Sequence, residues 1–399
     1  MRYLRSIIYL SVIVLLYQGI ANTDLSIISQ FTHQNGNDWA GPFSTALLFI
    51  GSGIGSLFNQ YIGKYPYKYL LFVGSFGYTL FIATGLIFMK MYFTAGALTL
   101  ICIGSFIGGL IVSVLYNSQF NYTNTLAKID GEEVKYFGIL GVFTQASNVY
   151  GSFLSAMLIG PLGQFHYVIV MDAAIFAISF FFLFLKDPLP EDLNLLVEEN
   201  SSPKSSPDRS VISSNSTHEE RNNSGPYHAI GCFVFTGFII AFIYNTLSII
   251  LYKTFEDSMD ETALNRLTFI IFIFEGVGEI IGGLCVVVFS RKITSPAKTY
   301  LGIASLFIVA FGIVYMGSLL KNYYIIGLGA VICGVCDCSN MSVALTIAGN
   351  WEKKGITAFN IGQCSSVAIS TMIMVFLNVP YIPILAIFFY IFCVGSLCH

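Results

Sequence analysis

Long apolar runs dominate this chain and restrict its fold more than any other feature. A helix needs about 20 mostly apolar residues to cross the hydrocarbon core of a membrane. Gly and Pro inside such runs are acceptable, because neighbouring helices satisfy the freed backbone groups. We find twelve runs, near residues 5–23, 41–63, 68–89, 92–116, 136–160, 166–186, 228–252, 267–289, 298–319, 323–347, 356–377 and 379–397. The sequence therefore predicts an all-α membrane protein with twelve transmembrane helices.

Composition agrees with a chain whose main partner is the lipid bilayer. Hydrophobic residues make up 55% of the chain and charged residues 10%, whereas soluble proteins carry about 25% charged residues. The net charge is only −3, without a long basic block, so we expect no nucleic-acid binding. The sequence contains no phosphate-binding glycine loop, catalytic triad or metal-ligand cluster. It therefore predicts neither an enzyme nor a bound cofactor or metal.

The distribution of Lys and Arg predicts the orientation of the chain. If all twelve runs span and the N-terminus is cytoplasmic, 15 basic residues face the cytoplasm and 4 face the other side. Cytoplasmic loops carry an excess of Lys and Arg. We therefore expect both termini and the central loop to be cytoplasmic.

The first run alone also fits a cleaved signal peptide. Arg2 and Arg5 precede an apolar stretch, and Gly19-Ile20-Ala21 resembles a cleavage site. Cleavage would leave eleven spans and an incomplete first half, so we favour a transmembrane helix.

A polar central segment divides the chain into two similar parts. Residues 187–226 are rich in Ser, Asn, Pro and charge, which predicts a disordered cytoplasmic linker between an N-terminal half, 1–186, and a C-terminal half, 227–399. Internal similarity supports the division, because Gly51, Gly55, Leu57 and Lys64 align with Gly278, Gly282, Leu284 and Arg291, and Gln145, Ser147 and Val149 with Gln363, Ser365 and Val367. Two six-helix halves joined in this way resemble the major facilitator superfamily.

Three stretches carry a closer resemblance, to the Unc-ninety-three-like branch of that superfamily. They are Gly276-Val-Gly278-Glu279-Ile-Ile-Gly282-Gly283, Gly334-Val-Cys-Asp337-Cys-Ser-Asn340, and the run from Asn117 through Gln145. The closest similarity is to the facilitator-domain members, whose substrates are not settled. Two departures stand out: Glu275 replaces an expected apolar residue, and Asn59-Gln60 replace the Asp and Arg of the superfamily's cytoplasmic motif.

The resemblance implies the secondary-transporter fold but leaves two functions open. The first is an orphan secondary transporter that moves a small solute by alternating access, with or without coupling to protons or cations. The second is a non-transporting regulator or trafficking partner of an ion channel, such as a potassium channel, or of a receptor. A transporter is expected to have a hydrated cavity at Glu279, Asp337, Gln145, Asn148 and Gln363.

Acidic residues within the predicted spans are the candidate coupling groups. Glu275 and Glu279 lie four residues apart on one helix face, and Asp337 precedes Asn340 by one turn. Helix rise places Glu279 roughly 18 Å and Asp337 roughly 21 Å below the outer ends of their spans. Lys, Arg and His occur only at the first or last residue of a predicted span, so none lies at the depth of these acids to neutralise them. These acids either exchange protons or hold a cation, or else they hydrogen-bond between helices as structural groups; Asp172 is interpreted as interfacial.

Two further predictions concern packing and sorting. Gly51-x-x-x-Gly55 and Gly278-x-x-x-Gly282 are small-residue motifs of the kind that packs helices together in membranes. Glu191-Asp-Leu-Asn-Leu195-Leu196 resembles an acidic dileucine sorting signal, which predicts the plasma membrane or endo-lysosomal membranes. Such signals are short, so a coincidental match in the linker remains the alternative.

Overall fold

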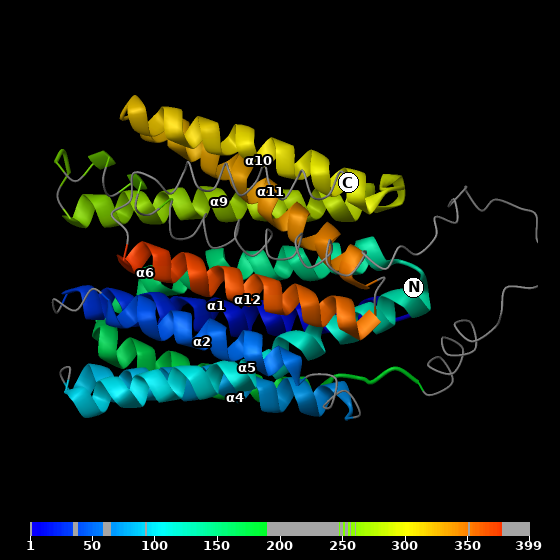
Figure 1. Ribbon diagram of the computed structural model, residues 1–399, viewed down its shortest axis with the longest axis horizontal. Helices are drawn as coiled ribbons and strands as arrows, with labels where there is room; N and C mark the ends of the chain where they lie inside the picture. Colours follow the sequence, from blue (N-terminus) through cyan, green and yellow to red (C-terminus); the bar gives the residue numbers. More distant parts are fainter. Residues whose placement is uncertain are drawn as a thin grey trace, which may run out of the picture.

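The computed structural model consists of helices and short connections in the residues it describes, which are 2–34, 39–58, 65–91, 94–189, a few positions between 247 and 259, 261–349 and 352–376. The helices run side by side along the long axis of the molecule (Figure 1). They are α1 (Leu4–Gln34), α2 (Ala40–Leu57), α4 (Tyr67–Lys90), α5 (Ala95–Asp130), α6 (Glu133–Ser179), α9 (Glu261–Phe289), α10 (Pro296–Leu319), α11 (Tyr323–Gly349) and α12 (Glu352–Phe376), with short 3₁₀ turns η1 (Phe180–Phe184) and η2 (Ser290–Lys292).

Eight helical stretches among the described residues are long and apolar enough to cross a membrane. They correspond to predicted spans 1–4, 6 and 8–10, while the fifth and eleventh lie in the first part of α6 and in α12. The predicted seventh span, 228–252, lies largely outside the described residues, and the twelfth, 379–397, lies entirely outside them. Most of the predicted linker, with Glu191, Leu195 and Leu196, also lies outside them, as do Asn59 and Gln60.

Three helices extend beyond the apolar runs from which they were predicted. The first continues to Gln34 rather than ending at 23, the fourth continues to Asp130 rather than 116, and the eighth begins at Glu261 rather than 267. At a rise of about 1.5 Å per residue, α5 is roughly 54 Å long, which exceeds the roughly 30 Å hydrocarbon core. The backbone hydrogen-bond ladder therefore continues past the apolar segment into polar sequence.

A sharp break divides α6 into two parts, as the separate predicted spans 136–160 and 166–186 require. Gly163 has φ 71° and ψ 157°, in a region that side chains with a Cβ rarely enter, and Pro161 lies two residues before it. The Ser155 and Tyr167 hydroxyls lie 3.0 Å apart across this break. The chain therefore folds back on itself at Gly163.

Buried apolar side chains form two clusters. One is drawn from α1, α2, α4, α5 and α6, and includes Tyr17, Tyr78 and Phe81. The other is drawn mainly from α9, α10, α11 and α12, with Phe120 of α5 and Phe137 of α6 also taking part. Helices of the two groups meet where α6 packs against α9 and α11, and where α2 packs against α12.

One end of the bundle carries Arg2, Asp130 and Arg291, and we call it the basic end. The Asp130 carboxylate accepts hydrogen bonds from the backbone N–H groups of Arg2 and Tyr3, at 3.1 and 3.0 Å. Arg291 lies 3.9 Å from Glu132, two residues after Asp130. The first turn of α1 and the ends of α5 and α9 therefore lie together at this end, the one predicted to face the cytoplasm.

Candidate functional site

Close backbone contact between α9 and α11 creates the candidate site. A Cβ on Gly278 would collide with the carbonyl oxygen of Val331, and one on Gly334 with that of Glu275. Gly282 meets Val335 in the same way. Because these glycines let the two backbones touch, the acidic residues of one helix lie against those of the other.

Three carboxyl groups are buried at this contact, and together we call them the carboxyl cluster. Glu275 and Glu279 of α9 are each 1% exposed and Asp337 of α11 is 0% exposed. Asp337 shares a side-chain hydrogen bond with Glu279. Two carboxyl groups form such a bond only when one of them carries a proton, since an ionised carboxylate has no donor.

A third helix, α6, joins the cluster through Gln145. The side-chain amide of Gln145 donates a hydrogen bond of 2.8 Å to Oδ2 of Asp337, across 192 residues of sequence. Gln145 is itself buried. The cluster therefore bridges α6, in the predicted N-terminal half, and α9 and α11, in the predicted C-terminal half.

Charge compensation is missing around the cluster in the part of the chain that is described. The ion pairs found there, Lys68–Asp187 at 3.6 Å and Arg291–Glu132 at 3.9 Å, both lie at helix ends. Both carboxyl oxygens of Glu275 lack a hydrogen-bond partner among the described residues. An ionised carboxylate buried in the protein without a hydrogen-bond donor is strongly disfavoured, so a proton or a bound cation is favoured at Glu275.

The other residues predicted from the sequence lie on α1-facing, α11, α12 and α2 positions, and they have different partners from the carboxyl cluster. Asn340 is buried on α11, and neither its amide oxygen nor its nitrogen has a partner within the described chain. Asn148, one turn beyond Gln145, accepts a 3.0 Å hydrogen bond from Asn22 of α1. Gln363 is half-buried on α12, and no hydrogen bond of its side chain is found among the described residues. Gly51 and Gly55 lie instead between α2 and α5, against Phe106 and Leu110.

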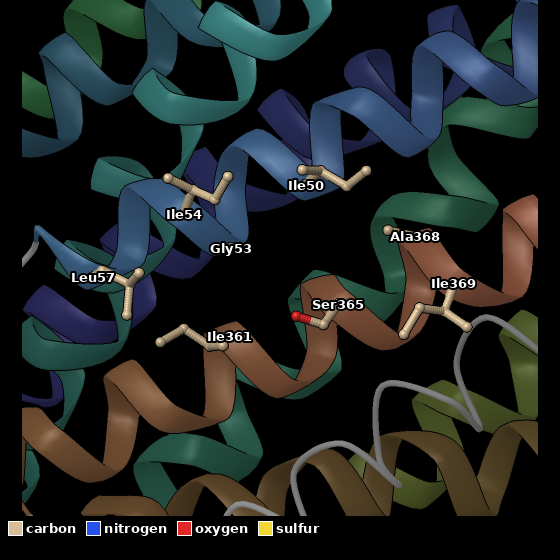
Figure 2. Close-up of a pocket in the computed structure, with 8 residues that line it drawn as sticks. All are labelled: Ile50, Gly53, Ile54, Leu57, Ile361, Ser365, Ala368 and Ile369. Carbon is tan, nitrogen blue, oxygen red and sulfur yellow. The ribbon is translucent and has the colours of Figure 1, made fainter.

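An apolar cavity of about 480 Å³ lies between α2 and α12, away from the cluster (Figure 2). Its lining residues are Ile50, Gly53, Ile54, Leu57, Ile361, Ser365, Ala368 and Ile369. None of the residues expected to line a hydrated cavity belongs to it. The polar residues of the cluster are instead packed against one another.

A polar seam closes the basic end between α2, α5 and α12. Asn117 donates to the Ser56 hydroxyl at 3.0 Å and to the Ser113 carbonyl at 2.8 Å, and Asn360 donates to the Asn117 amide oxygen at 2.6 Å. Nearby, Asn124 donates to the Gly349 carbonyl at 3.3 Å.

Sequence reasoning missed Asn360 and Asp24. Asn360 lies near the start of a predicted span and looks like a boundary residue. Asp24 follows the predicted end of the first span. The one sequence feature that indicates its burial is the apolar stretch Leu25-Ser-Ile-Ile28 after it.

Within the described residues, no group of three or more His, Cys, Asp or Glu side chains is placed to hold a metal ion.

The bundle of long apolar helices with acids buried inside it defines a polytopic membrane protein. The sequence profile of the Major Facilitator Superfamily matches residues 10–371, and the chain belongs to that superfamily. The predicted fold class is confirmed, as is a multi-pass membrane protein. A search among curated proteins found no match.

Solved transporter structures share the fold over nearly the whole chain. A bacterial homologue of the iron transporter ferroportin, in an outward-facing state with soaked iron, has a TM-score of 0.70 and 12% identity, covering 98% of each chain. The proton:xylose symporter XylE, bound to 6-bromo-6-deoxy-D-glucose, has a TM-score of 0.71 and 12% identity, covering 100% of this chain and 95% of that one. The human organic anion transporter MFSD10 has a TM-score of 0.64 and 11% identity, covering 98% and 99%. At these identities the likeness concerns the fold alone.

Proposed function

We propose that this protein is a secondary transporter of a small solute, of the Unc-ninety-three-like branch, and that the carboxyl cluster couples solute movement to protons. The observation that carries the proposal is the bridge from Gln145 to Asp337, with Asp337 in turn bonded to Glu279. This bridge joins a proton-binding group to the contact between the two predicted halves.

The bridge links protonation to the packing of α6 against α11. A hydrogen bond from an amide to an ionised carboxylate is roughly twice as strong as one to a neutral acceptor. When Asp337 takes up a proton, the bond from Gln145 therefore weakens, and the contact between α6 and α11 loses part of its stabilisation. In alternating access one half rocks against the other, so a proton at Asp337 shifts the balance between the two arrangements.

The test is uptake into proteoliposomes from a broad metabolite mixture, read by mass spectrometry, with and without a pH gradient. Glu279→Gln combined with Asp337→Asn keeps the shape and hydrogen-bonding capacity of the side chains and removes their titration. We expect this double variant to fold normally and to lose gradient-driven uptake. The matched control is Asp257→Asn, which removes an exposed acid that lies before α9 and outside the cluster, and is expected to leave uptake unchanged.

Two outcomes contradict the proposal. Full gradient-driven uptake in the double variant makes the carboxyl cluster structural. If the parent protein takes up nothing from the mixture, the alternative function is favoured, in which the protein is a regulator or trafficking partner of a channel or receptor.

A further inference from the structure

A second buried acid lies on α1, away from the carboxyl cluster. Asp24 is 0% exposed, because α1 continues for ten residues beyond it to Gln34. Neither of its carboxyl oxygens has a hydrogen-bond partner among the described residues. A buried carboxylate without a donor or counter-charge is strongly disfavoured, so Asp24 requires a ligand that neutralises it.

Asp172, on the second part of α6, is the charged neighbour of Asp24. A charge on Asp172 acts on Asp24, and Oδ1 of Asp172 is likewise buried without a partner in the described structure. Helix rise places Asp24 about 15 Å from the end of α1 and Asp172 about 14 Å from the break at Gly163. The two acids therefore lie at similar depth, toward the end opposite the basic end.

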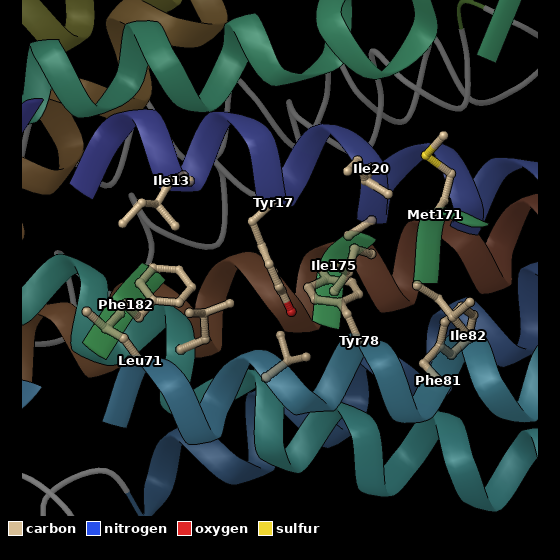
Figure 3. Close-up of a cluster of buried hydrophobic side chains, with 14 of the residues drawn as sticks. Ile13, Tyr17, Ile20, Leu71, Tyr78, Phe81, Ile82, Met171, Ile175 and Phe182 are labelled. Atoms are coloured by element: carbon tan, nitrogen blue, oxygen red, sulfur yellow. The ribbon is translucent and has the colours of Figure 1, made fainter. Parts of the chain in front are cut away.

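Packing of α1 against α6 holds this pair. A Cβ on Gly151 would collide with the Gly19 carbonyl and the Thr23 hydroxyl, so the backbones of α1 and α6 touch just before Asp24. Figure 3 shows Ile20 of α1 and Met171 of α6, the neighbour of Asp172, in one buried cluster. Asp172 is half-buried beside this packing.

The other titratable groups facing the pair are neutral tyrosines. Tyr167 of α6 senses the charge of Asp24, and its hydroxyl contacts Ser155 at 3.0 Å. Tyr17 of α1 senses the charge of Asp172 and donates its hydroxyl to the Ser75 carbonyl of α4, beside Tyr78. Residues 40–57 of α2 include no titratable side chain, and Lys68 and Lys90 lie at the two ends of α4.

We infer that Asp24 and Asp172 form a second proton-binding site, separate from the carboxyl cluster. One proton bound to either carboxylate gives a neutral carboxylic acid and removes the repulsion between the two like charges. A metal ion fits less well, because Ca²⁺ takes about six to eight oxygen ligands and the described residues here supply only two carboxyl groups. The protein thus takes up a proton between α1 and α6 as well as between α9 and α11.

Infrared difference spectroscopy on the purified full-length protein tests this site without any transport measurement. The C=O stretch of a protonated carboxylic acid is separate from the bands of carboxylates and amides. We expect the parent protein to show such a band at neutral pH that disappears reversibly as the pH is raised. Asp24→Asn should lose the component of that band that Asp24 contributes and keep the component from the carboxyl cluster, whereas the exposed-acid control Asp257→Asn should keep both.

A second variant keeps the inference falsifiable if Asp24→Asn does not fold. Asp172→Asn removes only the neighbouring charge, so it should change the pH at which the Asp24 band disappears. Identical spectra for the parent and Asp24→Asn would overturn the inference, as would an Asp24 component that persists at every pH or whose midpoint is unchanged in Asp172→Asn. Because uptake is not measured, failure here is distinguishable from failure of the coupling role of Glu279 and Asp337.

Discussion

Gly278 permits the helix contact on which the carboxyl cluster depends. Its missing Cβ leaves room for the Val331 carbonyl, and that approach brings Glu279 of α9 to Asp337 of α11. Backbone atoms have little freedom to move aside, because both helices are held by their own hydrogen-bond ladders. A methyl group at this position therefore has to separate α9 from α11.

We predict that Gly278→Ala lowers the thermal unfolding midpoint of the detergent-purified protein. The physical reason is overpacking, which typically destabilises by about 1–3 kcal/mol. Size-exclusion chromatography after heating measures the midpoint. Gly302→Ala is the matched control, because a Cβ at Gly302 of α10 meets no described atom within 4 Å. It should be neutral or stabilising by about 0.5–1 kcal/mol through helix propensity. Equal midpoints for the two variants would contradict the close contact at Gly278.

At the scale of elements, the seam of Asn117, Asn360 and Ser56 holds α5, α12 and α2 together at the basic end. All three side chains are buried, and the amides satisfy each other without any charge. Neutral hydrogen bonds each contribute only about 0.5–1.5 kcal/mol net. Such a seam therefore contributes a modest, charge-free share of the packing between these three helices.

Asn360→Ala is predicted to loosen the seam and expose Cys364, one turn further along α12. The substitution leaves the Asn117 amide oxygen without its donor, which costs about 1–3 kcal/mol. Cys364 is buried 3.5 Å from the Ser52 hydroxyl of α2. Labelling of Cys364 by a membrane-permeant thiol reagent should therefore become several-fold faster.

Asn322→Ala, in the turn before α11, is the control for this experiment, and Cys364→Ser identifies the label. An unchanged labelling rate in Asn360→Ala would mean that apolar packing alone closes this end.

At the scale of the whole molecule, Arg2 and Arg291 lie at the same end of the bundle, beside Asp130, and this end is the basic end. The contacts of Asp130 with α1 and of Glu132 with Arg291 bring together ends that are far apart in the chain. The excess of Lys and Arg on cytoplasmic loops then favours a cytoplasmic position for this end.

We predict that epitope tags inserted between 187 and 226, or after His399, remain inaccessible to antibodies outside unpermeabilised cells. A tag inserted after Met91, between α4 and α5 at the opposite end, should be accessible and serves as the control. Antibody binding to either of the first two tags without permeabilisation would overturn the orientation.

The sequence by itself determined the class of fold, because burial in lipid demands long apolar helices whatever their neighbours. Glu279 and Asp337 were also recognisable from sequence, since an acid inside an apolar run stands out. Helix ends were less predictable: hydropathy marks the hydrocarbon core, whereas the backbone ladder of α1 and α5 continues beyond it.

Only the tertiary structure decided which of these residues meet. Gln145 reaches Asp337 across 192 positions and Asn360 reaches Asn117 across 243, because the contacts depend on where glycines let helices touch. Asp24 shows most clearly that burial depends on tertiary packing. Its position after an apolar run indicated a boundary residue, and the packing of α6 on a longer α1 buried it. Hydropathy is a property of single residues, whereas burial and partners are properties of the packed bundle.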